Sequence, residues 1–156
     1  MLLTWLVMVA ALSPASVSDE RSQIDSVLDA FHTAASNADE AAYFELLAPE
    51  AIFLGTAPGE RWNVEEFRAF VHPYFSEGRG WSYEPRERHV QLDPSGQVAW
   101  FDEVLDNESY GETRGSGALR RVDGAWLIVQ YNLTIPIPNE LSKEVVALIR
   151  GTDSTP

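Results

Sequence analysis

Residues 97–137 read QVAWFDEVLDNESYGETRGSGALRRVDGAWLIVQYNLTIPI and decide the fold class. Apolar and polar residues alternate in three runs, 97–106, 111–122 and 125–137, which is the period of β-strands. The Asp123-Gly124 pair between the last two runs favours a tight turn. The stretch therefore predicts three consecutive strands that pair antiparallel.

A fourth strand is predicted just before this stretch, over residues 81–92, because the residues alternate in the same way and the turn residues 93–96 follow. Before Gly78 the apolar residues are instead three and four positions apart, the spacing of one helical face. This spacing predicts a first helix between Asp19 and Asn37. A second, shorter helix begins after the Asp39 cap, and a short apolar strand follows it over residues 51–54.

Two further helices are marked by the residues at their N-termini. Asn63 with Glu66 three positions later is a capping box that opens a third helix. Pro138 and Asn139 end the sheet and begin a C-terminal helix, whose apolar residues we expect to point inward: Leu141, Val145, Val146 and Ile149. Because the helices come first and the long strands follow, the predicted class is α+β and not alternating α/β.

The first 18 residues, MLLTWLVMVAALSPASVS, are predicted to be a signal peptide and not part of the fold. The apolar run from Leu2 to Leu12 is too short to span a bilayer as a helix, but it has the length of a signal hydrophobic core. An uncleaved N-terminal membrane anchor is the alternative. We therefore expect a secreted or periplasmic protein with one domain over residues 19–150 and a disordered tail over residues 151–156.

The composition excludes several classes of partner and site. With 24 acidic and 11 basic residues, the net charge of −13 leaves no stripe of cations for the phosphate backbone of nucleic acid. The absence of cysteine excludes disulfides, thiolate metal sites and a cysteine nucleophile. His32, His72 and His89 fall on three different elements without ligand spacing, so we predict no metal. No glycine-rich loop leads into a helix, and we predict no cofactor.

Apolar residues occupy both faces of the last predicted strand. Leu127, Val129 and Tyr131 share one face, and Trp126 and Ile128 lie on the other. Both faces of the sheet therefore need a cover, and the chain has helices enough for one. We expect a second copy of the sheet to cover the other face in a homodimer, with cover by the C-terminal helix as the alternative.

Five segments follow one another along residues 20–138: Asn37-Ala38-Asp39, the loop 55–62, VAWFDE at 98–103, RGSG at 114–117 and DGAWLIV at 123–129. Their order resembles the nuclear transport factor 2-like superfamily, and within it the SnoaL-like or ketosteroid-isomerase-like bacterial proteins. The resemblance covers nearly all of residues 20–138. It implies a cone, in which three N-terminal helices pack inside a strongly curved antiparallel sheet around a partly apolar pocket. It does not imply one function, because this scaffold hosts isomerases, dehydratases, cyclases, hydrolases and non-catalytic modules.

The best-known chemistry of this family lacks its residues here. Ketosteroid isomerases use a tyrosine in the first helix, an aspartate after the first strand and a protonated aspartate on a later strand. The resemblance places Phe31, Gly55 and Ala118 at these positions. An isomerase of that mechanism is therefore not expected.

Asp102 is the candidate general acid or base, because it lies in an apolar strand between Trp100 and Val104. Inside a pocket, the loss of water contact would raise its pKa toward the range that proton transfer needs. Its neighbour Glu103 would then point the other way. The alternative is that the carboxyl group of Asp102 is solvated or paired with a cation.

The residues that orient a ligand depend on the turn after Val122. A three-residue loop, which we expect, places the following side chains on the pocket face: Ser116, Arg120, Ile128, Gln130 and Asn132. A two-residue loop shifts the register by one and brings Gly115 and Gly117 to that face instead. Trp62, Tyr74 and Trp100 are predicted to line the same pocket, with a purely structural role in the core as the alternative.

Three functions are consistent with these residues. The first is a binding module that holds a small apolar or amphipathic molecule without converting it. The second is a cofactor-free dehydratase, cyclase or hydrolase in which Asp102 moves a proton. The third is a dimeric assembly module with a filled pocket. The small number of paired acid and base residues favours the first of these.

Overall fold

The computed structural model of this protein describes residues 17–152. Most of the predicted signal peptide and residues 153–156 of the predicted tail lie outside the described residues. Among the helices of the described part, none is long and apolar enough to cross a membrane.

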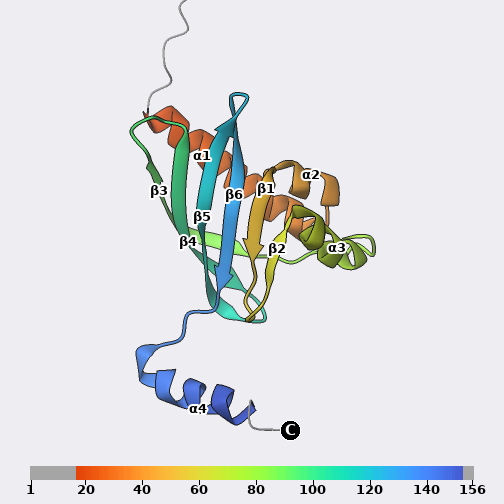
Figure 1. The fold of residues 1–156 in the computed structure, drawn as a ribbon, viewed down its shortest axis with the longest axis vertical. Coiled ribbons are helices and arrows are strands. Elements are labelled where there is room, and N and C mark those ends of the chain that lie inside the picture. The colour runs from red at the N-terminus through yellow and green to blue at the C-terminus, as the bar shows by residue number, and fades with distance from the viewer. Residues whose placement is uncertain (1–16, 153–156) are drawn as a thin grey trace, which may run out of the picture.

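Six strands form one sheet in the order β2-β1-β6-β5-β4-β3 (Figure 1). The strands are β1 (Leu47–Leu54), β2 (Arg61–Asn63), β3 (Glu84–Leu92), β4 (Val98–Asn107), β5 (Gly111–Val122) and β6 (Ala125–Thr134). The last four form the antiparallel meander that the sequence predicts. β1 pairs parallel with β6, which the sequence analysis did not foresee, and this pairing brings the N-terminal half of the chain into the sheet.

Three helices pack on one face of this curved sheet: α1 (Val17–Ser36), α2 (Glu40–Glu45) and α3 (Val64–Phe75) (Figure 1). Both predicted caps are present. The Asp39 carboxylate accepts a hydrogen bond from the Ala42 N–H at 3.0 Å. Asn63 and Glu66 bind each other's backbone N–H at 2.9 Å in a capping box. The predicted α+β class, with helices packed in a curved sheet, is confirmed.

The core lies between the inner face of the sheet and the helices. Leu105, Leu119 and Ile128 of the sheet have no exposed surface, and neither do Ile24 and Leu28 of α1. Burying one such side chain contributes about 1.5–3 kcal/mol. Ile128 is therefore part of the core and does not line a pocket, contrary to the expectation from the sequence.

The turn between β5 and β6 has two residues, so the expected three-residue loop is wrong. Asp123 and Gly124 both have positive φ, 50° and 87°, which is the type I′ geometry of two-residue hairpins. Val122 pairs directly with Ala125 across the turn.

A bulge in β6 then changes which residues face inward. Leu119 pairs with Ile128, but the adjacent Ala118 pairs with Gln130, so Val129 is the extra residue. Trp126 and Ile128 point inward before the bulge, and Tyr131 and Leu133 point inward after it. No simple alternation along residues 125–134 could reproduce this change of phase.

The C-terminal helix does not cover the sheet. η1 (Asn139–Leu141) and α4 (Ser142–Thr152) extend beyond the end of β6 (Figure 1). The expectation that the apolar residues of this helix point inward is wrong, because Leu141 and Val146 are 45% and 43% exposed. Residues 135–138 carry the chain past the end of the sheet. The apolar pattern identified a helix with an apolar face but not what covers that face.

Candidate functional site

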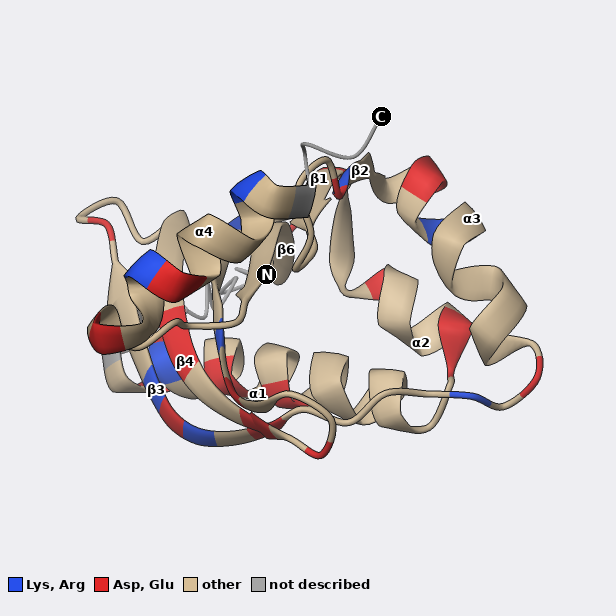
Figure 2. Ribbon diagram, turned by 90° about the horizontal axis from the view of Figure 1, so that it is seen from below, with Lys and Arg blue, Asp and Glu red and all other residues tan. Residues whose placement is uncertain are grey.

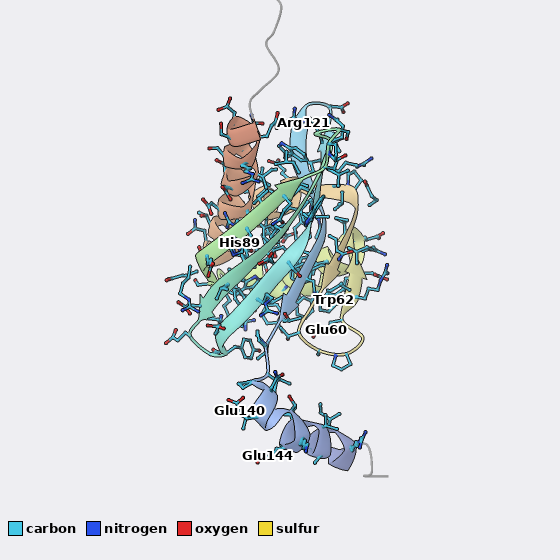
Figure 3. All side chains as sticks on the ribbon, turned by 90° about the vertical axis from the view of Figure 1, so that its left-hand side faces the viewer. Glu60, Trp62, His89, Arg121, Glu140 and Glu144 are labelled. Atoms are coloured by element: carbon cyan, nitrogen blue, oxygen red, sulfur yellow. The ribbon has the colours of Figure 1, made fainter. Side chains whose placement is uncertain are left out.

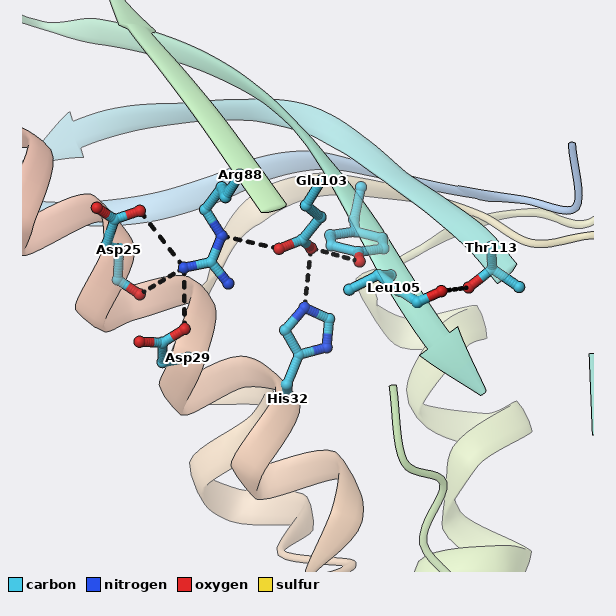
Figure 4. A network of polar contacts seen from close by, with 8 residues as sticks. Asp25, Asp29, His32, Arg88, Glu103, Leu105 and Thr113 are labelled. Atoms are coloured by element: carbon cyan, nitrogen blue, oxygen red, sulfur yellow. Dashed lines mark hydrogen bonds and ion pairs between the residues drawn. The ribbon is translucent and has the colours of Figure 1, made fainter. Parts of the chain in front are cut away.

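A buried carboxylate lies at the centre of a polar network under the sheet (Figure 4). Glu103 is 1% exposed on the inner face of β4. Its Oε1 accepts hydrogen bonds from His32 Nε2 at 2.8 Å and from the Tyr131 hydroxyl at 2.9 Å. Its Oε2 accepts one from Arg88 Nε at 2.8 Å. Each partner comes from a different element, so the network connects α1, β3, β4 and β6.

The network keeps Glu103 ionised. Burial opposes the charged form, but the hydrogen bonds from His32 and Arg88 and the positive charge of the Arg88 guanidinium outweigh it, so the pKa of Glu103 is lowered. Burial and the nearby negative charge raise the pKa of the Tyr131 hydroxyl well above its ordinary value, so it remains a donor. Because an ionised carboxylate only accepts, His32 must donate from Nε2.

Local sequence explains how these groups come together. A Cβ at Gly115 would collide with the Tyr131 hydroxyl and the Glu103 carboxylate, so glycine at this position leaves room for their contact. Arg88 continues the network to α1, where its Nη1 binds the Asp29 carboxylate at 2.9 Å and the Asp25 carbonyl at 3.2 Å. Figure 2 shows the basic residues of β3 beside the acidic residues of α1.

His32 lies between this network and a hollow at the protein surface. It is 8% exposed, and it helps to line a hollow of 280 Å³ together with Asp29, Ser36 and Tyr83. Because Nε2 is bound to Glu103, Nδ1 is the ring atom that could exchange a proton with a molecule in that hollow.

A larger cavity, of 340 Å³, lies between the helical side and the open end of the sheet. Its wall is mainly aromatic, with Phe53, Trp62, Phe67, Phe70, Tyr74, Trp81, Tyr83 and Tyr110. The rings support one another, since Phe53 stacks on Phe67 at a centroid distance of 4.0 Å and Trp62 stacks on Phe70 at 4.7 Å. The other lining residues are Gly55, Thr56, Glu60, Asn107, Ser109 and Leu133.

Glu60 supplies a carboxylate to this aromatic wall. Its Oε2 accepts a hydrogen bond from the Ala57 N–H at 2.9 Å, which folds the side chain back over the loop. A Cβ at Gly55 would collide with this oxygen, so the glycine leaves space for it. Figure 3 shows Glu60 and Trp62 at the same end of the sheet. The resemblance places Gly55 at the position where ketosteroid isomerases have an aspartate. In this chain the carboxylate of Glu60, five residues further along, lies beside Gly55.

Two of the predicted ligand-binding residues, Trp62 and Tyr74, line the aromatic cavity. The expectation that Asp102 points into the pocket is wrong, because it is exposed on the outer face and pairs with Ser116 of β5. The same outer face holds five further residues expected in the pocket: Trp100, Ser116, Arg120, Gln130 and Asn132. The two-residue turn and the bulge at Val129 account for this reversal.

Sequence reasoning missed Glu60, His32, Arg88 and Glu103 as site residues. A signal for Glu103 was available, because it alternates with Phe101 and Leu105, both of which are buried. His32 directly follows Phe31 on the apolar side of the first helix, and both are buried. Within residues 17–152, no three side chains of His, Cys, Asp or Glu gather as a metal site.

The fold is that of the nuclear transport factor 2-like proteins. The chain belongs to the SnoaL-like domain family, whose model matches residues 24–138. No curated protein matches it. A nuclear transport factor 2-like protein of unknown function from Pseudomonas putida KT2440 is similar in structure, with a TM-score of 0.66 and 17% identity over 80% of this chain and 92% of that one.

Two other solved structures share the fold. A protein of Streptomyces avermitilis, provisionally named a dehydratase of the same superfamily, has a TM-score of 0.65 and 12% identity over 79% of this chain and 100% of its own. A protein of Novosphingobium aromaticivorans, provisionally named an aromatic ring hydroxylase, has a TM-score of 0.65 and 16% identity over 80% of this chain and 94% of its own. At such identities the likeness shows the fold alone.

Proposed function

We propose that the protein binds a small apolar or amphipathic molecule in the aromatic cavity. The observation that carries this proposal is the 340 Å³ of space between aromatic side chains, with Glu60, Asn107 and Ser109 at its wall. A mainly apolar lining with a few polar groups is what small-molecule sites have in common. The same space argues against an assembly module with a filled pocket.

Native mass spectrometry of the purified chain tests this function, and a retained small molecule is the expected result. A matched pair of tryptophan variants locates the molecule. Trp62→Ala removes a ring that lines the cavity, whereas Trp100→Ala removes a ring on the outer face. The first variant should lose the bound molecule and the second should keep it. Loss in both variants, or retention in both, would place the molecule elsewhere.

A second candidate is an enzyme that uses His32 and not Asp102. The observation that favours it is the bond from His32 Nε2 to the buried Glu103 carboxylate, beside the 280 Å³ hollow. A carboxylate in this position orients the imidazole and stabilises the imidazolium that forms when Nδ1 accepts a proton. A dehydratase, cyclase or hydrolase without a cofactor could use such a base. His32→Gln should then abolish conversion of a molecule that occupies this hollow, and Asp102→Asn should not.

Two further proposals concern the whole chain. We propose that residues 1–18 direct secretion and are removed, and the intact mass of the exported protein should then correspond to residues 19–156.

We also propose a homodimer through the outer face of the sheet. Its support is the exposure of Trp100 and Val98, 48% and 39%, on a face that no helix of the described chain covers (Figure 1).

A further inference from the structure

The formal charge on the described wall of the aromatic cavity is negative. Among the described residues that line it, Glu60 is the only charged one, and no lysine, arginine or histidine is present. The faces of aromatic rings carry partial negative charge, so the rings add to the potential of the carboxylate. The chain as a whole carries a net charge of −13, which also favours a positively charged ligand.

Glu60 keeps an oxygen available for a ligand. Oε2 is engaged by the Ala57 N–H at 2.9 Å, and the loop is closed by a bond of 2.9 Å from the Gly55 N–H to the Glu60 carbonyl. These bonds fix the side chain at the wall and leave Oε1 to meet a second donor. The carboxylate is therefore positioned before a ligand arrives, which lowers the entropic cost of binding.

The aromatic rings near the opening form a row. The centroid of Phe70 lies 4.7 Å from that of Trp62 and 5.7 Å from that of Tyr74. Phe70 and Tyr74 are 40% and 38% exposed, so their rings can be reached from solvent. Tyr74 already attracts a cation within the chain, because the guanidinium carbon of Arg79 lies 5.0 Å from its ring centroid. The charge of Arg79 is balanced by Glu77 at 2.8 Å.

We infer that the ligand of this cavity is an organic cation, an amine or quaternary ammonium group on a planar or apolar skeleton. This inference rests on the proposed binding function and adds the charge of the ligand to it. The skeleton packs between the rings, and the cationic group lies against ring faces and Oε1 of Glu60. A neutral molecule gains only the burial of its apolar surface, and an anion is repelled by Glu60.

Isothermal titration calorimetry with three probes that share a naphthalene ring tests this inference. The probes are naphthylmethyl-trimethylammonium, naphthalenemethanol and naphthoate, which are cationic, neutral and anionic. We expect the cation to bind about tenfold more tightly than the alcohol, because a partly desolvated cation–π contact and one carboxylate add to the same apolar burial. Naphthoate should bind most weakly. Added salt should reduce the advantage of the cation.

Three variants locate the source of the preference. Glu60→Gln keeps an acceptor for the Ala57 N–H but removes the charge. Glu65→Gln removes the same charge from an exposed position in the first turn of α3, outside the cavity lining. Phe70→Leu keeps an apolar side chain but removes an aromatic face. Glu60→Gln and Phe70→Leu should each weaken the cation several-fold and leave the alcohol within about twofold, and Glu65→Gln should change neither.

The outcomes separate this inference from the binding function on which it rests. If the three probes bind equally, or the anion binds best, the cationic ligand is wrong and the binding function stands. If Glu65→Gln weakens the cation as much as Glu60→Gln, the attraction comes from the surface charge, and the inference is wrong. If no probe and no retained molecule binds, both fail. Phe70→Leu changes a side chain at the surface, so it gives an answer even if Glu60→Gln unfolds the loop.

Discussion

Glu103 and Asp102 are neighbours in β4 but face opposite sides of the sheet, so the same loss of charge has different costs at the two positions. Glu103→Gln leaves the Arg88 guanidinium without a buried counter-charge and His32 without its charged acceptor. We expect it to lower the free energy of unfolding by about 3–5 kcal/mol. Asp102→Asn changes an exposed residue and should cost less than about 0.5 kcal/mol. Urea unfolding followed by tryptophan fluorescence measures both, and equal losses would contradict the buried network.

Glu103 should also make stability depend on pH in the acidic range. Its pKa in the folded protein is lowered from an ordinary value of 4.5, so its contribution is fully present above that value and is lost as pH falls through the folded pKa. The free energy of unfolding should therefore decline below about pH 4.5 in the parent chain, and more steeply than in Glu103→Gln. Parallel curves for the two proteins, measured by urea unfolding across this range, would show that Glu103 does not titrate with a shifted pKa.

At the scale of elements, the bulge in β6 determines which side chains meet under the sheet. Gly117 pairs with Tyr131 just after the bulge, and a Cβ there would collide with the Gln130 carbonyl and come within 3.0 Å of the Phe101 ring. Gly117→Ala should therefore destabilise the protein by about 1–3 kcal/mol through overpacking. Ser116→Ala, on the outer face, is the control and should change stability by less than about 0.5 kcal/mol. Thermal unfolding of the two variants distinguishes them, and a neutral Gly117→Ala would mean that the pairing of β5 and β6 is looser than described.

The elements that were predicted correctly depend on local signals. The Asp39 cap, the Asn63 and Glu66 capping box and the turn after residue 92 involve contacts within a few residues of the chain. The bulge at Val129 has no such signal. Because strand side chains alternate with a period of two, one extra residue moved Gln130 and Asn132 from the predicted pocket face to the outer face.

The residues of the site were harder to predict from the sequence than the fold, because a site depends on residues that only the folded chain brings together. His32 and Glu103 are 71 positions apart, and nothing in the spacing of either reveals the other. Trp62 and Tyr74 were found from their residue type alone, because small-molecule pockets are lined mainly by apolar and aromatic side chains. Glu60 reaches the cavity because the loop 55–60 folds back on Gly55, which residue types alone do not indicate.

At the scale of the molecule, exposed apolar side chains on two elements of the described chain could meet a partner. Trp100 lies on the outer face of the sheet, where it is 48% exposed, and Leu148 lies on α4, where it is 71% exposed. Exposed apolar side chains that gather on a protein surface mark association sites. We propose that the sheet face meets its equivalent in a second copy, since a two-fold axis lets one surface cover itself.

Light scattering coupled to size exclusion should therefore give the mass of a dimer across a range of protein concentrations. Trp100→Glu places a charge at the centre of the proposed interface and should yield monomers, because two unpaired carboxylates would be buried about the two-fold axis. Leu148→Glu makes the same change on α4 and should leave the dimer intact. If only Leu148→Glu yields monomers, the second copy is held by α4 and the outer face of the sheet is free. The cavity is lined from the inner side of the sheet, so ligand affinity should stay the same in Trp100→Glu whichever surface holds the dimer.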